Sequence, residues 1–157
     1  AMNPIAQDYQ MAAEAAAAML KENLGVDVAL QKTEFANFQQ GMNRRTVFQA
    51  FMTGWAADYL DYSDYLDLLL YSKSPLDRVS YANPDFDRLV DDANAAPTEA
   101  QRTVLYHKAE ALAVEDAAMI PIVFSQFALL KKPYVHGLET TPALTGWLRF
   151  NTVSIQK

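Results

Sequence analysis

The sequence predicts an α/β fold, in which helices flank a mixed sheet, within a single domain of 157 residues. Three observations favour this fold. Two apolar segments, 26–30 and 47–52, have the character of strands and enclose a predicted helix over residues 33–42. Helical patterns lie on both sides of this unit. A strand, a helix and a second strand in this order form a βαβ unit, whose crossover is nearly always right-handed.

The first half of the chain contains a long helix followed by the βαβ unit. Residues 4–24 begin with a proline, are rich in alanine and are followed by Gly25, which is typical of a helix with a defined stop. Residues 26–30 alternate apolar with small or polar residues, as strands do. Thr33 is the expected N-cap of the next helix. Residues 47–52 contain little polarity, which indicates a strand covered on both faces.

The second half is predicted to be helical before it ends in strands. Asn83 followed by Pro84 predicts an N-cap with proline in the first helical position. Thr98 begins a capping box, Thr-Glu-Ala-Gln, for a later helix. The expected elements are helical turns over 60–71, a helix from Asn83, a helix over 99–116, and strands over 120–130 and 148–155.

Composition and charge exclude several classes of function. The chain has 13 basic and 19 acidic residues and a formal net charge of −6, whereas nucleic-acid binding needs clustered positive charge. The absence of cysteine excludes a disulfide scaffold and a cysteine-based zinc site. No stretch approaches the ~20 apolar residues of a membrane span, and no signal-peptide pattern is visible. The two histidines, His107 and His136, lack the spacing of a metal pair, so we expect no metal or cofactor.

The most unusual segment is 54–67, where four aspartates recur at every third position. They are Asp58, Asp61, Asp64 and Asp67. This spacing does not match a calcium loop, and the last three are expected to be solvated or capping carboxylates. Asp58 differs, because it follows an apolar strand and lies near Trp55, at the position where ligands bind to open α/β sheets. A ligand cation could bind Asp58 beside the indole, although simple packing of Trp55 is the alternative.

The segment resembles a motif of the family 5 solute-binding proteins, the oligopeptide- and dipeptide-binding components of ABC importers. Further motifs of this family follow in the same order along nearly the whole chain. The matching segments are GWxADYxDxxxxL at 54–66, YANPDFD at 81–87, RxxLYxKAE at 102–110, ED at 115–116, IPI at 120–122 and KPxVxG at 132–137.

The resemblance implies one lobe of a two-lobed, periplasmic-binding-protein-like fold that closes around its ligand. The chain would then be most of the C-terminal lobe of a longer protein, with residues 1–2 as a cloning remnant and residues 136–157 as a tail that crosses towards the other lobe. The implied function is the capture of peptides, or other solutes with an amine, for delivery to the ABC permease in the membrane. The implied location is the periplasm, or the outer face of the cytoplasmic membrane through a lipid anchor.

The resemblance also implies a set of ligand-binding residues. By position in the motif they are Met52, Gly54, Trp55, Ala56 and Asp58, with Arg44, Arg45 and Phe124 added from neighbouring segments. Asp58 is implied to pair with the ligand's ammonium. Oligopeptide-binding relatives have an arginine where this chain has Met52, so Arg44 or Arg45 could supply the cation for a ligand carboxylate. Phe124 matches a stretch that carries aromatic pocket residues in relatives.

Three alternative functions make different demands on the structure. An oligosaccharide-binding protein would stack sugar faces on Trp55 and use Asp58 as a hydroxyl acceptor. An enzyme would need a titratable pair such as Asp58 and His107 in one pocket, although His107 is expected to be solvated. A structural interaction module would cover Trp55 with the chain itself.

Overall fold

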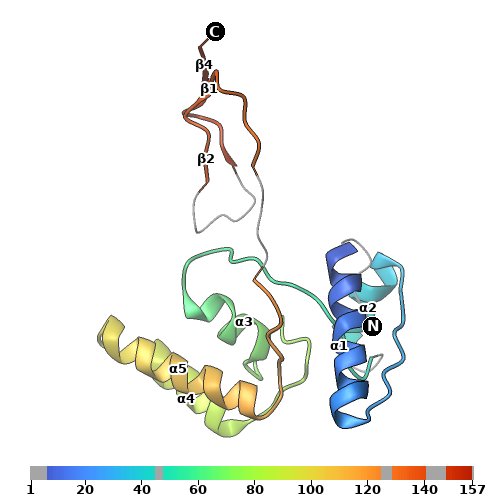
Figure 1. Ribbon diagram of the computed structural model, residues 1–157. Coiled ribbons are helices and arrows are strands. Elements are labelled where there is room, and N and C mark those ends of the chain that lie inside the picture. Colours follow the sequence, from blue (N-terminus) through green and yellow to red (C-terminus); the bar gives the residue numbers. More distant parts are fainter. Residues whose placement is uncertain (1–6, 45–47, 125–128, 141–147, 157) are drawn as a thin grey trace.

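The structure, a computed structural model, describes residues 7–44, 48–124, 129–140 and 148–156 and is mainly helical. Its elements are α1 (Gln7–Leu24), α2 (Phe35–Arg44), the 3₁₀ turn η1 (Tyr62–Asp64), α3 (Leu66–Leu70), α4 (Pro84–Asn94), α5 (Glu99–Glu115), β1 (Val135–His136), β2 (Glu139–Thr140), β3 (Leu148–Arg149) and β4 (Ser154–Ile155). Figure 1 shows three groups: α1 with α2, a body of α3, α4 and α5, and short strands that extend away from the helices.

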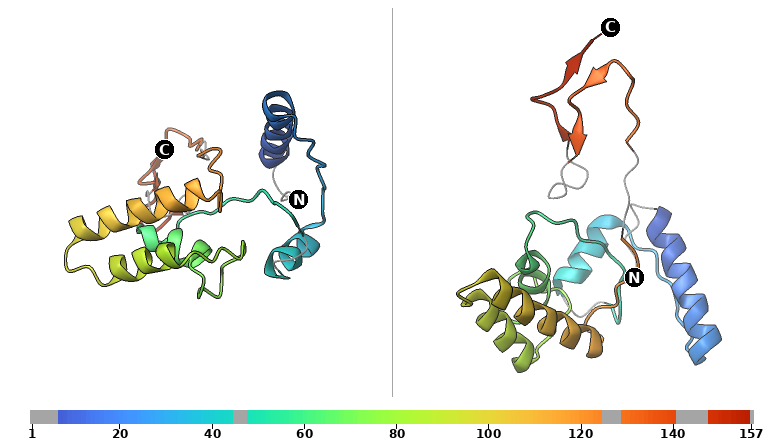
Figure 2. Two further views of the ribbon diagram at one scale, coloured as in Figure 1. Left: turned by 90° about the horizontal axis from the view of Figure 1, so that it is seen from below. Right: turned by 60° about the vertical axis from the view of Figure 1, so that its left-hand side comes forward.

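The main core lies where α3, α4 and α5 pack together. Figure 2 shows α4 and α5 side by side, and both contribute side chains with no exposed surface. Phe86, Val90 and Ala93 follow one another at helical spacing on α4, and Tyr106 and Ala109 face them from α5. The rest of this cluster is Leu66, Leu70 and Ala113. A second, smaller contact forms where α2 buries Phe38 against Phe48 and Phe51.

Two of the predicted helix caps are confirmed and one is wrong. Asn83 accepts hydrogen bonds through its side chain from the backbone N–H groups of Asp85 and Phe86, at 2.9 and 3.3 Å. Thr98 accepts from the N–H of Gln101 at the start of α5. Thr33, by contrast, is not the cap of α2, because its hydroxyl is buried without a hydrogen-bond partner among the described residues.

The predicted mixed sheet is not present in the described residues. Segment 26–30 forms no strand, the described part of 47–52 contains only an isolated bridge residue, Met52, and residues 120–124 and 129–130 also form no strand. Residues 47 and 125–128 lie outside the described residues. The predicted strand 148–155 is split into β3 and β4, with a turn between them.

The strands that do form are short and antiparallel. β1 pairs with β4, with Val135 opposite Ile155, and β2 pairs with β3, with Glu139 opposite Arg149. Gly137 lies between β1 and β2 with a φ of 72°, in the left-handed region that favours glycine. The described part of the predicted tail, 136–157, therefore takes part in a pair of short antiparallel ladders.

The difference from the predicted sheet has a physical cause. Alternating apolar residues predict strand propensity, but a strand forms only where a neighbour satisfies its N–H and C=O groups. In the described parts of segments 26–30, 47–52 and 120–130 the backbone forms no ladder longer than the isolated bridge at Met52, and many of the apolar side chains are exposed. Ile120 is 75% and Phe124 is 100% exposed, and Val26, Val28 and Leu30 are also exposed.

We predict that the α4–α5 contact dominates the stability of the body. Replacing the fully buried Phe86 by alanine removes a ring from this core and should lower the free energy of unfolding by about 3–5 kcal/mol. Val104 lies on the same pair of helices but is 53% exposed, so Val104→Ala should have little effect. Urea unfolding followed by circular dichroism measures both. Equal losses in the two variants would contradict this assignment of the core.

Candidate ligand-binding site

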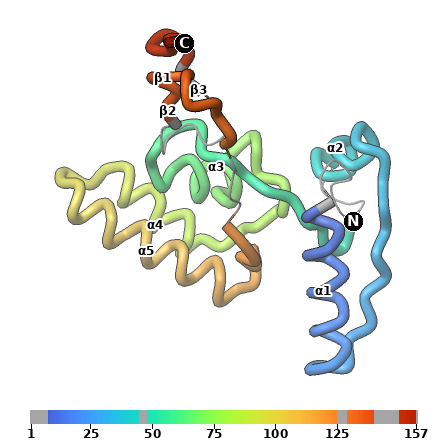
Figure 3. Tube along the Cα trace, turned by 45° about the horizontal axis from the view of Figure 1, so that its top comes forward, coloured from blue at the N-terminus to red at the C-terminus, as the bar shows by residue number. Residues whose placement is uncertain are grey.

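The predicted ligand-binding motif lies on the segment that connects α2 to η1. Figure 3 shows this segment running between the group formed by α1 and α2 and the helical body. Trp55 is half-buried, whereas Gly54, Ala56 and Asp58 are exposed. The segment contains no helix or strand between Arg44 and Tyr62 in its described part, and side-chain hydrogen bonds help to hold it in place.

Asp64 provides the contacts that hold Trp55 and Asp58. One of its carboxylate oxygens, Oδ2, accepts the indole N–H of Trp55 at 2.9 Å and the backbone N–H of Asp58 at 3.2 Å. Asp64 has 0% exposure, so its prediction as a solvated or capping carboxylate is wrong. Hydrogen bonds to an ionised acceptor are stronger than neutral ones, and sharing one acceptor fixes the indole relative to the Asp58 backbone.

Asp61 attaches the same segment to α5. Its side chain caps η1 by accepting the N–H of Ser63, and it also binds both terminal nitrogens of Arg102. The hydrogen-bonded Arg102 guanidinium holds the pKa of the Asp61 carboxyl well below its usual range, against the opposing effect of burial. The expectation of a capping role for Asp61 is therefore confirmed, and the ion pair adds a connection to α5.

Asp67 belongs to a partly buried network rather than to the surface, which corrects its predicted solvation. Its carboxylate oxygens accept from the hydroxyl of Tyr106 at 2.9 Å and from the amide of Asn94 at 2.6 Å. Burial raises the pKa of Asp67, and burial together with the neighbouring Asp67 raises the pKa of Tyr106. Tyr106 also lies under the Arg102 guanidinium, whose Cζ atom is 4.8 Å from the ring centroid. Tyr106 therefore contacts both Asp67 and the arginine that binds Asp61.

Two other side chains approach the motif from different elements. A Cβ atom at Gly54 would meet the hydroxyl of Tyr9 from α1, so the Tyr9 side chain would have to shift to admit a larger residue. The guanidinium of Arg78 lies over the ring of Trp55, with its Cζ atom 5.9 Å from the ring centroid. Sequence reasoning misses both contacts, because both residues lie far from the motif along the chain.

The other predicted ligand-binding residues are not joined to Trp55 or Asp58. Met52 is half-buried, Arg44 is exposed at the end of α2, and Phe124 is fully exposed. No hydrogen bond, ion pair or ring contact between described residues connects these three to the motif. Arg45 lies outside the described residues.

His107 does not support the enzyme alternative. It is exposed, as predicted, and its Nε2 atom lies 3.2 Å from the hydroxyl of Tyr62. No hydrogen bond joins it to Asp58 in the part of the chain that the structure describes. The described residues also contain no group of three or more potential metal ligands, and none of their helices has the length and hydropathy to cross a membrane.

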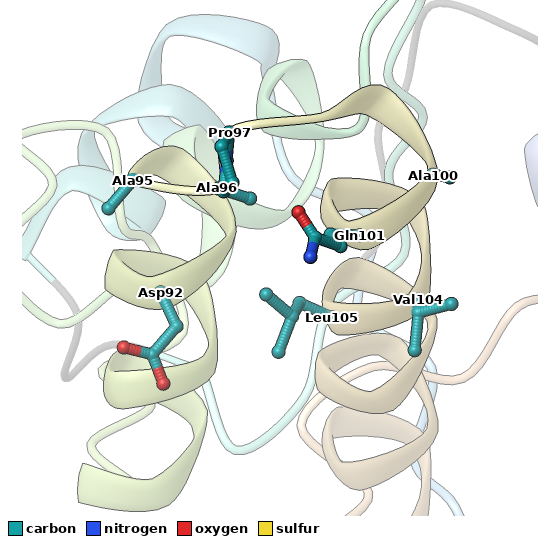
Figure 4. A pocket seen from close by; sticks show the side chains of 8 residues that line it. All are labelled: Asp92, Ala95, Ala96, Pro97, Ala100, Gln101, Val104 and Leu105. Atoms are coloured by element: carbon teal, nitrogen blue, oxygen red, sulfur yellow. The ribbon is translucent and has the colours of Figure 1, made fainter.

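A separate pocket of about 630 Å³ lies where the chain turns from α4 into α5. Figure 4 shows its lining, in which Leu105 and Gln101 of α5 face Ala95 and Ala96 across the turn. None of the predicted ligand-binding residues contributes to it. We therefore place the candidate site at Trp55 and Asp58, on the chemistry of its side chains.

We predict that Asp61 makes stability dependent on pH. Its pKa is lower in the folded than in the unfolded chain, so its contribution is present above the unfolded value, about 3.9, and is lost as the pH falls. Asp61→Asn should therefore lower the free energy of unfolding by ~1–3 kcal/mol at pH 7, and by less at about pH 2.5, where part of the contribution has already been lost. Chemical denaturation at both pH values measures this. A loss that is the same at both would contradict it.

We also predict that Asp64 controls the indole of Trp55. Asp64→Ala removes the acceptor, so exchange of the Trp55 indole proton with solvent should accelerate at least about tenfold, which NMR can follow. Trp147→Phe separates the two tryptophan signals. Asp64→Asn keeps an acceptor oxygen and should retain part of the protection. Unchanged exchange in Asp64→Ala would show that the hydrogen bond from the indole to Asp64 does not form in solution.

Known proteins are similar to this chain over most of its length. No family model matches it. It is 35% identical over 129 residues to the periplasmic oligopeptide-binding protein OppA of Escherichia coli, covering 82% of this chain and 23% of that protein. It is 30% identical over 135 residues to the dipeptide-binding protein DppE of Bacillus subtilis, covering 86% of this chain and 24% of that protein.

A solved structure gives the same result. The complex of Haemophilus influenzae OppA with the peptide RPPGFSPFR matches with a TM-score of 0.79 and 26% identity, over 99% of this chain and 30% of that one. The chain thus spans about a quarter of the length of the curated relatives that it matches. These relatives are solute-binding proteins and not enzymes. The resemblance predicted from the motifs is confirmed: the chain matches one part of the oligopeptide- and dipeptide-binding proteins of family 5.

Proposed function

We propose that this chain is most of the C-terminal lobe of the solute-binding component of an ABC importer, and that Asp58 binds the ammonium group of a peptide. The observation that carries this proposal is the state of the Asp58 side chain. It is exposed and forms no hydrogen bond or ion pair with other described residues, although its backbone is held by Asp64. A carboxylate on a fixed backbone is available to an incoming cation.

The chemistry of the site suits a primary ammonium. An ammonium group has three N–H donors and no acceptor, so it pairs with a carboxylate through charge-assisted hydrogen bonds. The indole of Trp55 lies beside Asp58 and provides an apolar wall next to the charge. Because Asp64 already fixes the Trp55 indole and the Asp58 backbone, binding has fewer groups to order, which lowers its entropic cost.

The exposed apolar segments are evidence in favour of a partner lobe. Ile120, Ile122 and Phe124 are exposed here, as are Val26 and Val28, and contiguous exposed apolar surface is typical of an interface. We propose that the remainder of a longer protein, including an N-terminal lobe, covers part of this surface. Closure of the two lobes about a hinge would then bury the ligand.

The relatives support the kind of ligand and the location. The names of the matched proteins describe oligopeptide or dipeptide binding, and the Escherichia coli relative is named as periplasmic. We propose the same for this chain: capture of peptides outside the cytoplasmic membrane, in the periplasm or through a lipid anchor, and delivery to an ABC permease. Residues 136–157 would be the tail that reaches towards the other lobe.

Substitution of Asp58 tests this function. In the longer protein, Asp58→Ala should weaken the binding of dialanine and trialanine by ~2–5 kcal/mol, because the buried ammonium loses its partner. Isothermal titration calorimetry measures the affinities. Asp85→Ala is the matched control, since Asp85 is an exposed aspartate on α4 that pairs with Arg88. Unchanged peptide affinity in Asp58→Ala would remove Asp58 from the site, and binding of sugars in place of peptides would favour the oligosaccharide alternative.

A further inference from the structure

Arg78 is a charged residue at the site, and the proposed binding of an ammonium by Asp58 gives it no role. Its side chain is half-buried, and its guanidinium lies over the Trp55 ring. In the part of the chain that the structure describes, no carboxylate lies within ion-pair distance of Arg78. Arg88 and Arg102, by contrast, each bind an aspartate. The chain has more acidic than basic residues, so the lack of a partner for Arg78 does not reflect a shortage of carboxylates.

The contact with Trp55 leaves the donors of Arg78 available. A cation over an aromatic face is attracted by the electrons of the ring, and at 5.9 Å the Arg78 cation is within the range of this interaction. The attraction uses the charge of the guanidinium but none of its five N–H groups. No hydrogen bond from Arg78 to another described residue satisfies these donors. The ring therefore orients the guanidinium while its hydrogen-bonding capacity remains for another molecule.

Trp55 is linked to both Arg78 and Asp58. The indole N–H of Trp55 and the backbone N–H of Asp58 converge on the same oxygen of Asp64, and the ring of the same tryptophan contacts Arg78. Although their charges are opposite, no ion pair joins the side chains of Asp58 and Arg78, both of which the structure describes. Among the described residues, the site thus has a carboxylate and a guanidinium without partners, on two residues linked through Trp55. This pair of charges is complementary to a molecule that carries both an ammonium and a carboxylate.

We propose that Arg78 binds a carboxylate of the ligand, so that the site selects molecules with an ammonium and a carboxylate close together. This inference rests on the proposed function. A guanidinium binds a carboxylate through two parallel N–H···O bonds, and a lysine cannot reproduce this geometry. The carboxylate is either the C-terminus of a very short peptide or an acidic side chain near the N-terminus. Arg78 takes the role for which the sequence alone suggests Arg44 or Arg45.

Calorimetry on the longer protein with three ligands tests this role. The ligands are dialanine, dialanine amide, and Glu-Ala amide, which has a side-chain carboxylate but no free C-terminus. The unsubstituted protein should bind dialanine, or Glu-Ala amide, at least about tenfold more tightly than dialanine amide. Preference for dialanine identifies the C-terminus as the source of the carboxylate, and preference for Glu-Ala amide identifies the side chain.

The variants separate recognition from packing. Arg78→Ala should abolish the preference for the carboxylate-bearing ligand and leave the affinity for dialanine amide nearly unchanged. Arg78→Lys keeps the charge and should restore only part of the preference. Arg88→Ala removes an exposed, paired arginine and should leave the preference intact. Circular dichroism of each variant checks that it is folded.

Two results would overturn the inference. If Arg78→Ala weakens dialanine and dialanine amide equally, Arg78 only supports the Trp55 ring. If the preference persists in Arg78→Ala while Asp58→Ala still abolishes binding, the proposed function stands and the role of Arg78 does not. Failure of the unsubstituted protein to bind any of the three ligands would count against both the proposed function and this role.

Discussion

The candidate site depends on one buried carboxylate. Asp64, the last residue of η1, uses a single oxygen to accept the indole N–H of Trp55 and the backbone N–H of Asp58, which lie in a segment without helix or strand. Its second oxygen is buried and has no partner among the described residues. Burying a carboxylate with an unsatisfied oxygen costs free energy. Other interactions in the fold must therefore offset this cost, and they lie around Asp64.

The compensating interactions connect Asp64 to the helical body. Asp64 ends η1, which Asp61 caps and which Arg102 of α5 holds through Asp61. Arg102 lies on Tyr106, a fully buried residue of the core formed by α3, α4 and α5. The core thus fixes α5, α5 fixes η1, and η1 fixes the groups that we propose bind the ligand. A change in the core should reach the site through this chain of contacts.

The sequence predicts local features well and distant ones poorly. The caps at Asn83 and Thr98 are predictable, because an N-cap depends on residues within one turn of the helix. The sheet is not, since a strand needs a partner that its own residues do not specify, and in the described part of the chain the apolar segments form no more than an isolated bridge at Met52. The helical turns predicted over residues 60–71 agree with η1 and α3.

The same distinction applies to the site. The motif identifies Trp55 and Asp58, but four aspartates at equal spacing give no sign that Asp64 is the buried one. Its burial follows from a contact with Trp55, nine residues away, and that contact exists only in the folded chain. Arg78 escapes sequence reasoning for the same reason, because it meets the Trp55 ring only when the chain folds distant segments together.

These contacts mean that the proposed ligand site is ordered without a ligand. The body holds Asp64, and Asp64 holds Trp55 and the backbone of Asp58. The carboxylate of Asp58 has no partner among the described residues, and we propose that it binds an ammonium group. The match to oligopeptide- and dipeptide-binding proteins places this arrangement in a part of proteins whose names describe peptide binding. The exposed apolar segments are consistent with the proposed second lobe, which would cover part of them.

The most direct test is a crystal structure of the longer protein with a short peptide bound. We expect the ammonium nitrogen of the peptide about 2.7–3.0 Å from a carboxylate oxygen of Asp58, with the Trp55 indole still donating to Asp64. A bound peptide whose ammonium group is held by other residues, with the Asp58 carboxylate left in solvent, would contradict the proposed role of Asp58.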